Sequence, residues 1–73
     1  MPPLSDLSGS EIARALGRLG FAKVRQSGSH LLMRNGSRLC VVPMHKSIKR
    51  GTLAGILRQA KISTEAFTAA LLQ

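Results

Sequence analysis

The tripeptide Gly28-Ser29-His30 brings together three residue types that suit chemistry on a bound ligand. Glycine lets the backbone approach a ligand closely. A serine hydroxyl can bond a phosphate or orient an imidazole, and a free imidazole titrates near neutral pH, so it can act as general base or acid. His30 is therefore the candidate catalytic residue, with Gly28 and Ser29 in support, although an ordinary surface histidine would give the same pattern.

His45 is the second histidine of the chain, and it follows the third predicted strand. The end of that strand lies near the beginning of the second strand in an antiparallel hairpin, so we expect His45 at the same sheet edge as His30. Two imidazoles there could share acid and base duties. His45 could equally contact only phosphate, or lie in a solvated loop.

Three cations, Lys46, Lys49 and Arg50, precede a helix predicted to open at Gly51-Thr52. Free backbone amides and the helix dipole favour an anion at such a position. This cluster, with Thr52, predicts a phosphate contact, and a solvated basic loop is the alternative. Further candidate contacts on the predicted strands are Lys23, Arg25 and Arg34.

The sequence contains no recognisable set of residues for a metal site, a nucleotide-binding loop or a Ser-His-Asp triad. Two histidines, one cysteine and three scattered acids form no familiar metal site. The chain has no Walker loop, dinucleotide fingerprint or paired carboxylates. A Ser-His-Asp triad would have to use Asp6, which we expect in a tail. We therefore expect any catalysis to need neither a metal nor a cofactor.

The charge balance indicates a polyanionic partner. Eleven Lys and Arg residues face three acids among 73 residues, for a formal net charge of +8. Such a field attracts polyanions, of which nucleic acid is the commonest, with an acidic protein or an anionic membrane surface as alternatives.

The lone Cys40 fits a reducing compartment. The sequence shows neither a secretory signal nor an apolar run of membrane-spanning length, so we expect a cytoplasmic protein with no membrane partner.

The predicted elements are a helix, three strands and two helices in one domain. Ser8-Gly9-Ser10-Glu11 is a capping box that opens the first helix, and Gly20 suits its end. Residues 1–7 are expected to form a tail and residues 8–73 a single domain. The predicted segments are helix 9–19, strands 21–26, 30–34 and 38–42, and helices beginning at 51 and at 63–65.

Side-chain alternation assigns the two faces of the predicted sheet. Asn35-Gly36 is the strongest hairpin signal, and a two-residue turn there pairs Leu32 with Leu39 and His30 with Val41. In the first strand, Lys23 and Arg25 are expected on one face. The predicted core face carries Leu31, Met33, Cys40 and Val42. The predicted open face carries His30, Leu32, Arg34, Leu39 and Val41.

The chain resembles the HicA family over about Ser8 to its C-terminus. The resemblance is carried by GFAKVRQSGSH at residues 20–30, VPMH at 42–45, GTLAGILRQA at 51–60 and ISTEAF at 62–67. The sequence departs from the usual pattern in two places, one after His30 and one after the second helix. Leu31 and Leu32 follow the histidine where relatives often have histidine or polar residues, which could alter substrate preference or antitoxin fit. Lys61 stands where a glycine is common after the second helix.

The resemblance implies an α+β fold like that of the double-stranded-RNA-binding domain, α-β-β-β-α, here with an additional C-terminal helix and a three-stranded antiparallel sheet. It implies a toxin of a toxin–antitoxin pair that cleaves mRNA, uses His30 as its catalytic histidine and is silenced by a HicB antitoxin. The rival hypotheses are a non-catalytic RNA-binding module and a basic adaptor for an acidic protein.

Two expectations follow for mechanism and partner. His30 would take the proton from a ribose 2′-hydroxyl, which attacks the adjacent phosphorus, while Lys46, Lys49 and Arg50 neutralise the developing charge. The apolar residues of the open face form an unusual exposed patch, which predicts the surface that HicB covers. These antitoxin-binding candidates are Leu32, Leu39 and Val41.

Overall fold

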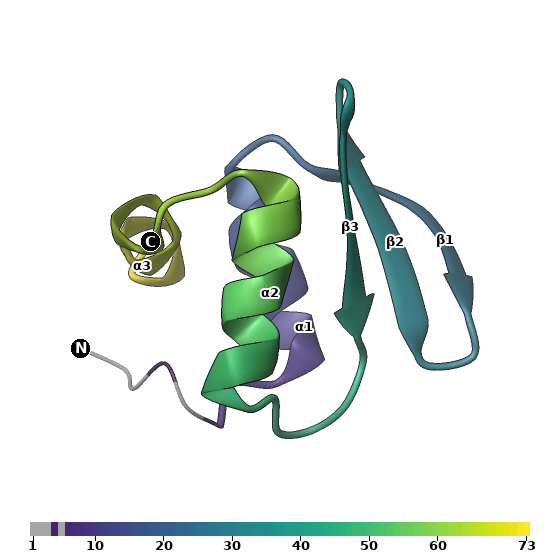
Figure 1. Ribbon diagram of the computed structural model, residues 1–73, viewed down its shortest axis with the longest axis horizontal. Helices are drawn as coiled ribbons and strands as arrows, with labels where there is room; N and C mark the ends of the chain where they lie inside the picture. Colours follow the sequence, from purple (N-terminus) through teal and green to yellow (C-terminus); the bar gives the residue numbers. More distant parts are fainter. Residues whose placement is uncertain (1–3, 5) are drawn as a thin grey trace.

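The computed structural model describes residue 4 and residues 6–73, and its elements follow the predicted order (Figure 1). Residues 1–3 and 5, which belong to the predicted tail, lie outside the described residues. The elements are α1 (Gly9–Arg18), β1 (Ala22–Ser27), β2 (His30–Asn35), β3 (Arg38–Pro43), α2 (Arg50–Ala60) and α3 (Thr64–Leu71).

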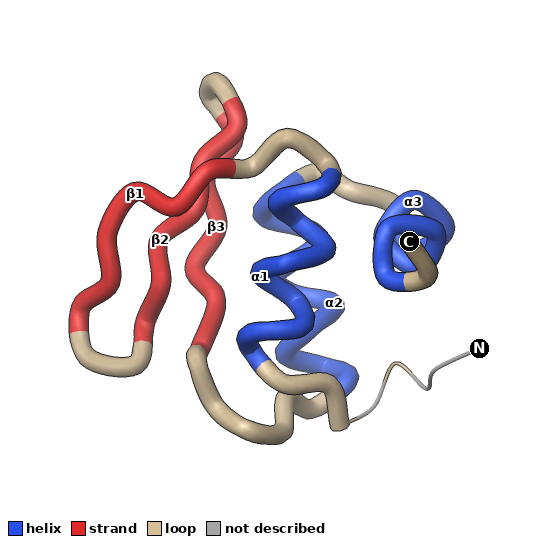
Figure 2. Tube along the Cα trace, turned by 180° about the vertical axis from the view of Figure 1, so that it is seen from behind, coloured by secondary structure: helices blue, strands red, loops and turns tan. Residues whose placement is uncertain are grey.

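The three strands form an antiparallel sheet in the order β1-β2-β3, and the helices lie on one side of it. Figure 2 shows the same layers from behind, with α3 on the far side of α1 from the sheet. The predicted α+β architecture, with its additional C-terminal helix, is therefore confirmed. No helix in the described part of the chain is both long enough and apolar enough to cross a bilayer.

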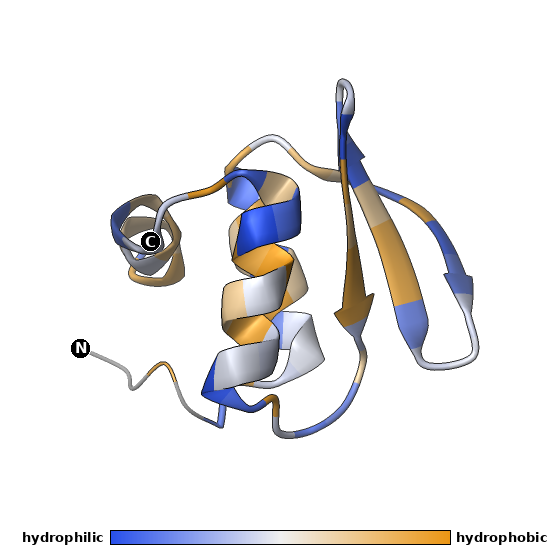
Figure 3. Ribbon diagram, in the orientation of Figure 1, coloured by the Kyte–Doolittle hydropathy of each residue, from blue (hydrophilic) through white to orange (hydrophobic). Residues whose placement is uncertain are grey.

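The core lies between the sheet and α1 and α2. Residues Leu31, Met33, Cys40 and Val42 are at most 3% exposed, as expected for the core face. Figure 3 shows hydrophobic residues concentrated in β2, β3 and the adjacent turns of the helices. The helices and the segments beside them complete this core with Ile12, Leu16, Phe21, Leu53, Ile56, Leu57 and Phe67.

The β2–β3 turn differs from the prediction by one position. Gly36 and Ser37 are its two central residues, because Asn35 pairs with Arg38. Gly36 has φ +62° and Ser37 does not have positive φ, which is the pattern of a type II′ turn rather than type I′. Asn35 is instead held in the strand, and its side-chain amide donates to the Leu19 carbonyl at 3.3 Å.

The shifted turn changes which residues of β2 and β3 pair with each other, but it does not change the face of the sheet on which each residue lies. Leu32 pairs with Val41, and His30 pairs with Pro43, so the predicted pairs were wrong. Moving a two-residue turn by one position moves each partner by two, and residues two apart share a face of a strand. The assignment of core and open faces was therefore correct even though the register was not.

A β-bulge in β1 overturns the prediction that Lys23 and Arg25 share a face. Lys23 pairs with Met33 and Arg25 pairs with Leu32, so Val24 is the extra, unpaired residue. A bulge adds one residue to the alternation. Lys23 consequently lies on the helix side of the sheet, beside Arg14 of α1, while Arg25 lies on the open face.

Contacts at both ends of α1 connect it to distant segments. The capping box is present, with the Ser8 hydroxyl accepting from the Glu11 amide at 3.0 Å and Glu11 accepting from the Ser8 amide at 2.9 Å. Leu7, placed in the tail by the sequence, is 4% exposed and pairs with Ile48. The Arg18 side chain donates to the Ala70 carbonyl at 2.9 Å and so connects α1 to α3.

Candidate active site and nucleic-acid interface

His30 lies at the first residue of β2, directly after a tight turn that presents it to solvent. Gly28 and Ser29 are the two central residues of that turn, because Ser27 pairs with His30. Gly28 has φ +59°, which glycine adopts at little cost. The Gln26 side chain donates to the Gly28 carbonyl at 3.0 Å and braces the turn.

His45 lies beside this turn, in the loop that leaves β3. Its Nε2 is 3.3 Å from the Ser29 hydroxyl oxygen. The loop backbone is fixed on both sides, because the Met44 amide donates to the Ser29 carbonyl at 2.6 Å and the Gly9 amide donates to the His45 carbonyl at 2.8 Å. The second histidine is thus held at the sheet edge where its position in the sequence predicted it.

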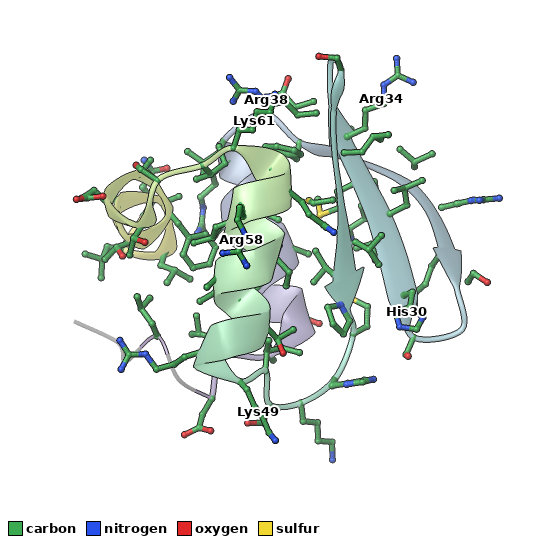
Figure 4. The ribbon with its side chains drawn as sticks, viewed as in Figure 1. His30, Arg34, Arg38, Lys49, Arg58 and Lys61 are labelled. Atoms are coloured by element: carbon green, nitrogen blue, oxygen red, sulfur yellow. The ribbon has the colours of Figure 1, made fainter. Side chains whose placement is uncertain are left out.

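The two histidines line one surface hollow of about 300 Å³. We call it the histidine hollow, and its lining is His30, Pro43, His45, Ser47, Ile48, Lys49 and Thr52. Figure 4 shows His30 and Lys49 at the same end of the molecule, with Arg34 and Arg38 at the opposite end. Two imidazoles, an ammonium and two hydroxyls around one hollow can bind an anion and exchange protons with it.

The other predicted phosphate contacts are spread over the surface. Lys46 is exposed in the loop between β3 and α2. Arg50 opens α2 one residue earlier than predicted and lines a different hollow, with Leu4 and Leu53. Arg34 lies toward the far end of β2 and donates to the Gly36 carbonyl at 2.9 Å. Of the predicted cations, therefore, Lys49 is the one that lines the hollow with the histidines.

The apolar residues of the open face lie in neighbouring positions on β2 and β3. Leu32 is partly buried and pairs with Val41, which is 40% exposed. Leu39, at 50% exposure, is two residues from Val41 on the same strand and face. His30 alternates onto this face as well, so the apolar patch and the candidate catalytic residue share one side of the sheet.

Sequence reasoning missed the residues that extend the site along α2. A second hollow of about 340 Å³ runs between α2 and the free edge of β3. The available signal was the helical spacing of Thr52, Gly55 and Arg58-Gln59, which places them on one face of a helix. We call this hollow the α2–β3 groove, and it is lined by Val41, Pro43, Thr52, Gly55, Ile56, Arg58 and Gln59.

The fold and site define a small basic α+β domain with an exposed pair of histidines at one edge of its sheet. Comparison with family models extends this to a family: the one described as HicA toxin of bacterial toxin-antitoxin matches residues 9–62. The chain belongs to this family and is a toxin of the toxin–antitoxin type, which implies an antitoxin partner. A search of curated proteins gave no match.

Proposed function

We propose that this toxin is an endoribonuclease that cleaves mRNA in the cytoplasm. The observation that carries the proposal is the histidine hollow, where exposed His30 is accompanied by His45 and Lys49. RNA supplies both groups that such a hollow can use, a nucleophile in its 2′-hydroxyl and an anion in its phosphate.

The proposed reaction is an internal transfer at phosphorus. His30 accepts the 2′-hydroxyl proton as that oxygen attacks the adjacent phosphorus. The bond from phosphorus to the 5′-oxygen breaks, and His45 in its protonated form supplies a proton to the leaving oxygen. The products are a 2′,3′-cyclic phosphate and a free 5′-hydroxyl, so the step balances without a metal or a cofactor.

Neighbouring groups hold the reacting parts in place. Ser29 accepts or donates at His45 Nε2, and Gly28 allows the turn that presents His30. Lys49 and Thr52 contact the reacting phosphate and oppose the charge that develops on its oxygens. The substrate outside the hollow is held by the remaining predicted cations, Lys23, Arg25, Arg34, Lys46 and Arg50.

The test is cleavage of a labelled RNA by purified protein in excess EDTA, beside His30→Ala and His45→Ala. We expect the wild type to cut and His30→Ala to lose at least about 100-fold in rate, since positioned acid–base catalysis contributes about 10²–10⁴-fold. A 2′-deoxy substitution at the scissile ribose should abolish cutting. Fluorescence anisotropy on an uncleavable RNA checks that the variants still bind.

Two outcomes would contradict this function. Binding without cutting by the wild type would indicate a non-catalytic RNA-binding module. Equal cutting by the wild type and His30→Ala would assign the activity to another residue or a contaminating nuclease.

We further propose that the antitoxin is a HicB protein and that it covers the open face of the sheet. Support comes from the exposed apolar residues Leu32, Leu39 and Val41, which share that face with His30. A partner seated there would bury the patch and close access to the histidine at the same time.

A further inference from the structure

The α2–β3 groove meets the histidine hollow at two shared residues. Pro43 and Thr52 line both depressions, so the surface is continuous from the histidines to the far part of α2. From Thr52 to Gln59 the helix rises roughly 10 Å at about 1.5 Å per residue. That length corresponds to about three nucleotides stacked at about 3.4 Å.

The groove is cationic and open to a ligand. Arg58 lines it, and its guanidinium turns back along the helix, with one nitrogen 3.8 Å from the position a Cβ on Gly55 would take. The guanidinium therefore lies along the helix near Gly55, one turn back from the carbonyls that end α2. Figure 4 shows Lys49 below the first turn of α2 and the Arg58 side chain beside the middle of the helix.

A hydrogen bond to one side chain connects the two walls of the groove. Gln59 accepts a hydrogen bond from the Val41 amide on the free edge of β3, at 3.4 Å. This contact connects helix to strand, and Gly55 adds no side chain of its own to the floor beside the Arg58 guanidinium. Such a floor admits a flat group, and the Gln59 amide nitrogen remains as a donor.

We propose that the α2–β3 groove binds the single-stranded segment of the substrate that adjoins the scissile nucleotide, with Arg58 on a backbone phosphate. Charge complementarity selects this occupant, because the groove carries a guanidinium and the substrate carries one negative charge per nucleotide. The inference rests on the ribonuclease function proposed above and extends it from the reacting phosphate to the neighbouring nucleotides.

The experiment uses DNA oligonucleotides with a single ribonucleotide, so that one bond can be cut, and flanks of one to six nucleotides on either side. For the wild type we expect kcat/KM to rise with flank length on one side and level off after about three nucleotides. Arg58→Gln should lose this gain, about 3- to 10-fold, while keeping the rate on the shortest substrate.

A second variant tests the groove floor with a matched control. Gly55→Glu places a carboxylate in the groove beside the Arg58 guanidinium, and Gly17→Glu makes the same change at a glycine of α1 with open space around it. Only Gly55→Glu should remove the flank dependence. Binding of an all-DNA strand, measured by anisotropy, should lose about 0.7 from its log–log salt slope in Arg58→Gln.

The outcomes separate this inference from the function on which it rests. Absence of cutting by the wild type on every substrate would overturn the ribonuclease function, and the salt slope would still report on the groove. Cutting with equal flank dependence in the wild type, Arg58→Gln and Gly55→Glu would overturn the groove proposal alone.

Discussion

At the scale of single residues, Cys40 shows how burial decides the chemistry of a side chain. It lies on the core face of β3 at 1% exposure, and desolvation raises the pKa of its thiol above the ordinary value of about 9.0. A thiolate is the reactive form of cysteine. The one thiol of this chain is therefore a packing group, whereas the histidines remain in contact with solvent.

Cys40 should resist thiol reagents until the protein unfolds. At pH 8 we expect labelling by a disulfide reagent to be slow in buffer and fast in urea. Above the pKa of the unfolded thiol, the unfolded chain loses a proton that the folded chain keeps, so the free energy of unfolding falls as pH rises. Urea titrations of the wild type and Cys40→Ala between pH 7 and 10 measure the part of this pH dependence that Cys40 causes. Equal labelling rates of the wild type in buffer and in urea would contradict the burial of the thiol.

At the scale of elements, Gly9 sets the distance between α1 and the loop that carries His45. A Cβ at Gly9 would collide with the Pro43 carbonyl oxygen and would lie 2.7 Å from the Met44 Cα. Both are backbone atoms, so the loop itself would have to move. The same movement would strain the hydrogen bond from the Gly9 amide to the His45 carbonyl.

Gly9→Ala should therefore lower the free energy of unfolding by about 1–3 kcal/mol, as overpacking does. It should also lower the cleavage rate by more than the unfolded fraction of the protein accounts for. Gly17→Ala is the control, because Gly17 is helical and has open space around it. That variant should gain about 0.5–1 kcal/mol from helix propensity and keep its activity. Unchanged stability and activity in Gly9→Ala would show that the loop position is not set by this contact.

Lys61 ends α2 in the left-handed conformation, with φ +57° and ψ +42°. This conformation costs a residue with a Cβ roughly 1–2 kcal/mol, and glycine is the usual residue at such a helix end. Lys61→Gly should raise the free energy of unfolding by about 0.5–1 kcal/mol, seen as a rise in Tm of several degrees. Lys61→Ala removes the same charge without relieving the strain, so an equal gain there would attribute the effect to charge.

At the scale of the whole molecule, the sheet separates two surfaces with different characters. One side packs on the helices, and β1 extends beyond them with all six of its residues exposed. The other side stays uncovered and combines apolar residues with His30 in a chain of net charge +8. An acidic antitoxin surface would meet both the apolar patch and the positive field.

Leu39→Glu should weaken antitoxin binding at least about tenfold, because it adds a charge to the proposed interface. Its side chain is 50% exposed, so the folded protein should lose little stability. Leu72→Glu makes the same change at 57% exposure at the end of α3 and serves as the control. Isothermal titration with the antitoxin measures both, and equal losses in the two variants would place the interface elsewhere.

Local chemistry was sufficient to predict the elements and the faces of β2 and β3. A capping box, glycine turns and alternating apolar residues act over a few positions, so they can be recognised in sequence. The Gly28-Ser29-His30 pattern made His30 a candidate, the resemblance to a known family pointed to the same residue, and the hairpin order placed His45 at the same edge. These predictions depended on neighbours in the chain, or on a family already known.

Only the tertiary structure decided how distant segments meet. The bulge at Val24 moved Lys23 to the helix side, and the type II′ turn shifted every partner of β3 by two. The bond from Arg18 to Ala70 joins residues 52 positions apart, and the α2–β3 groove joins Arg58 to the histidine hollow. Each depends on contacts between residues far apart in sequence, whose geometry follows from packing the whole chain rather than from any short segment of it.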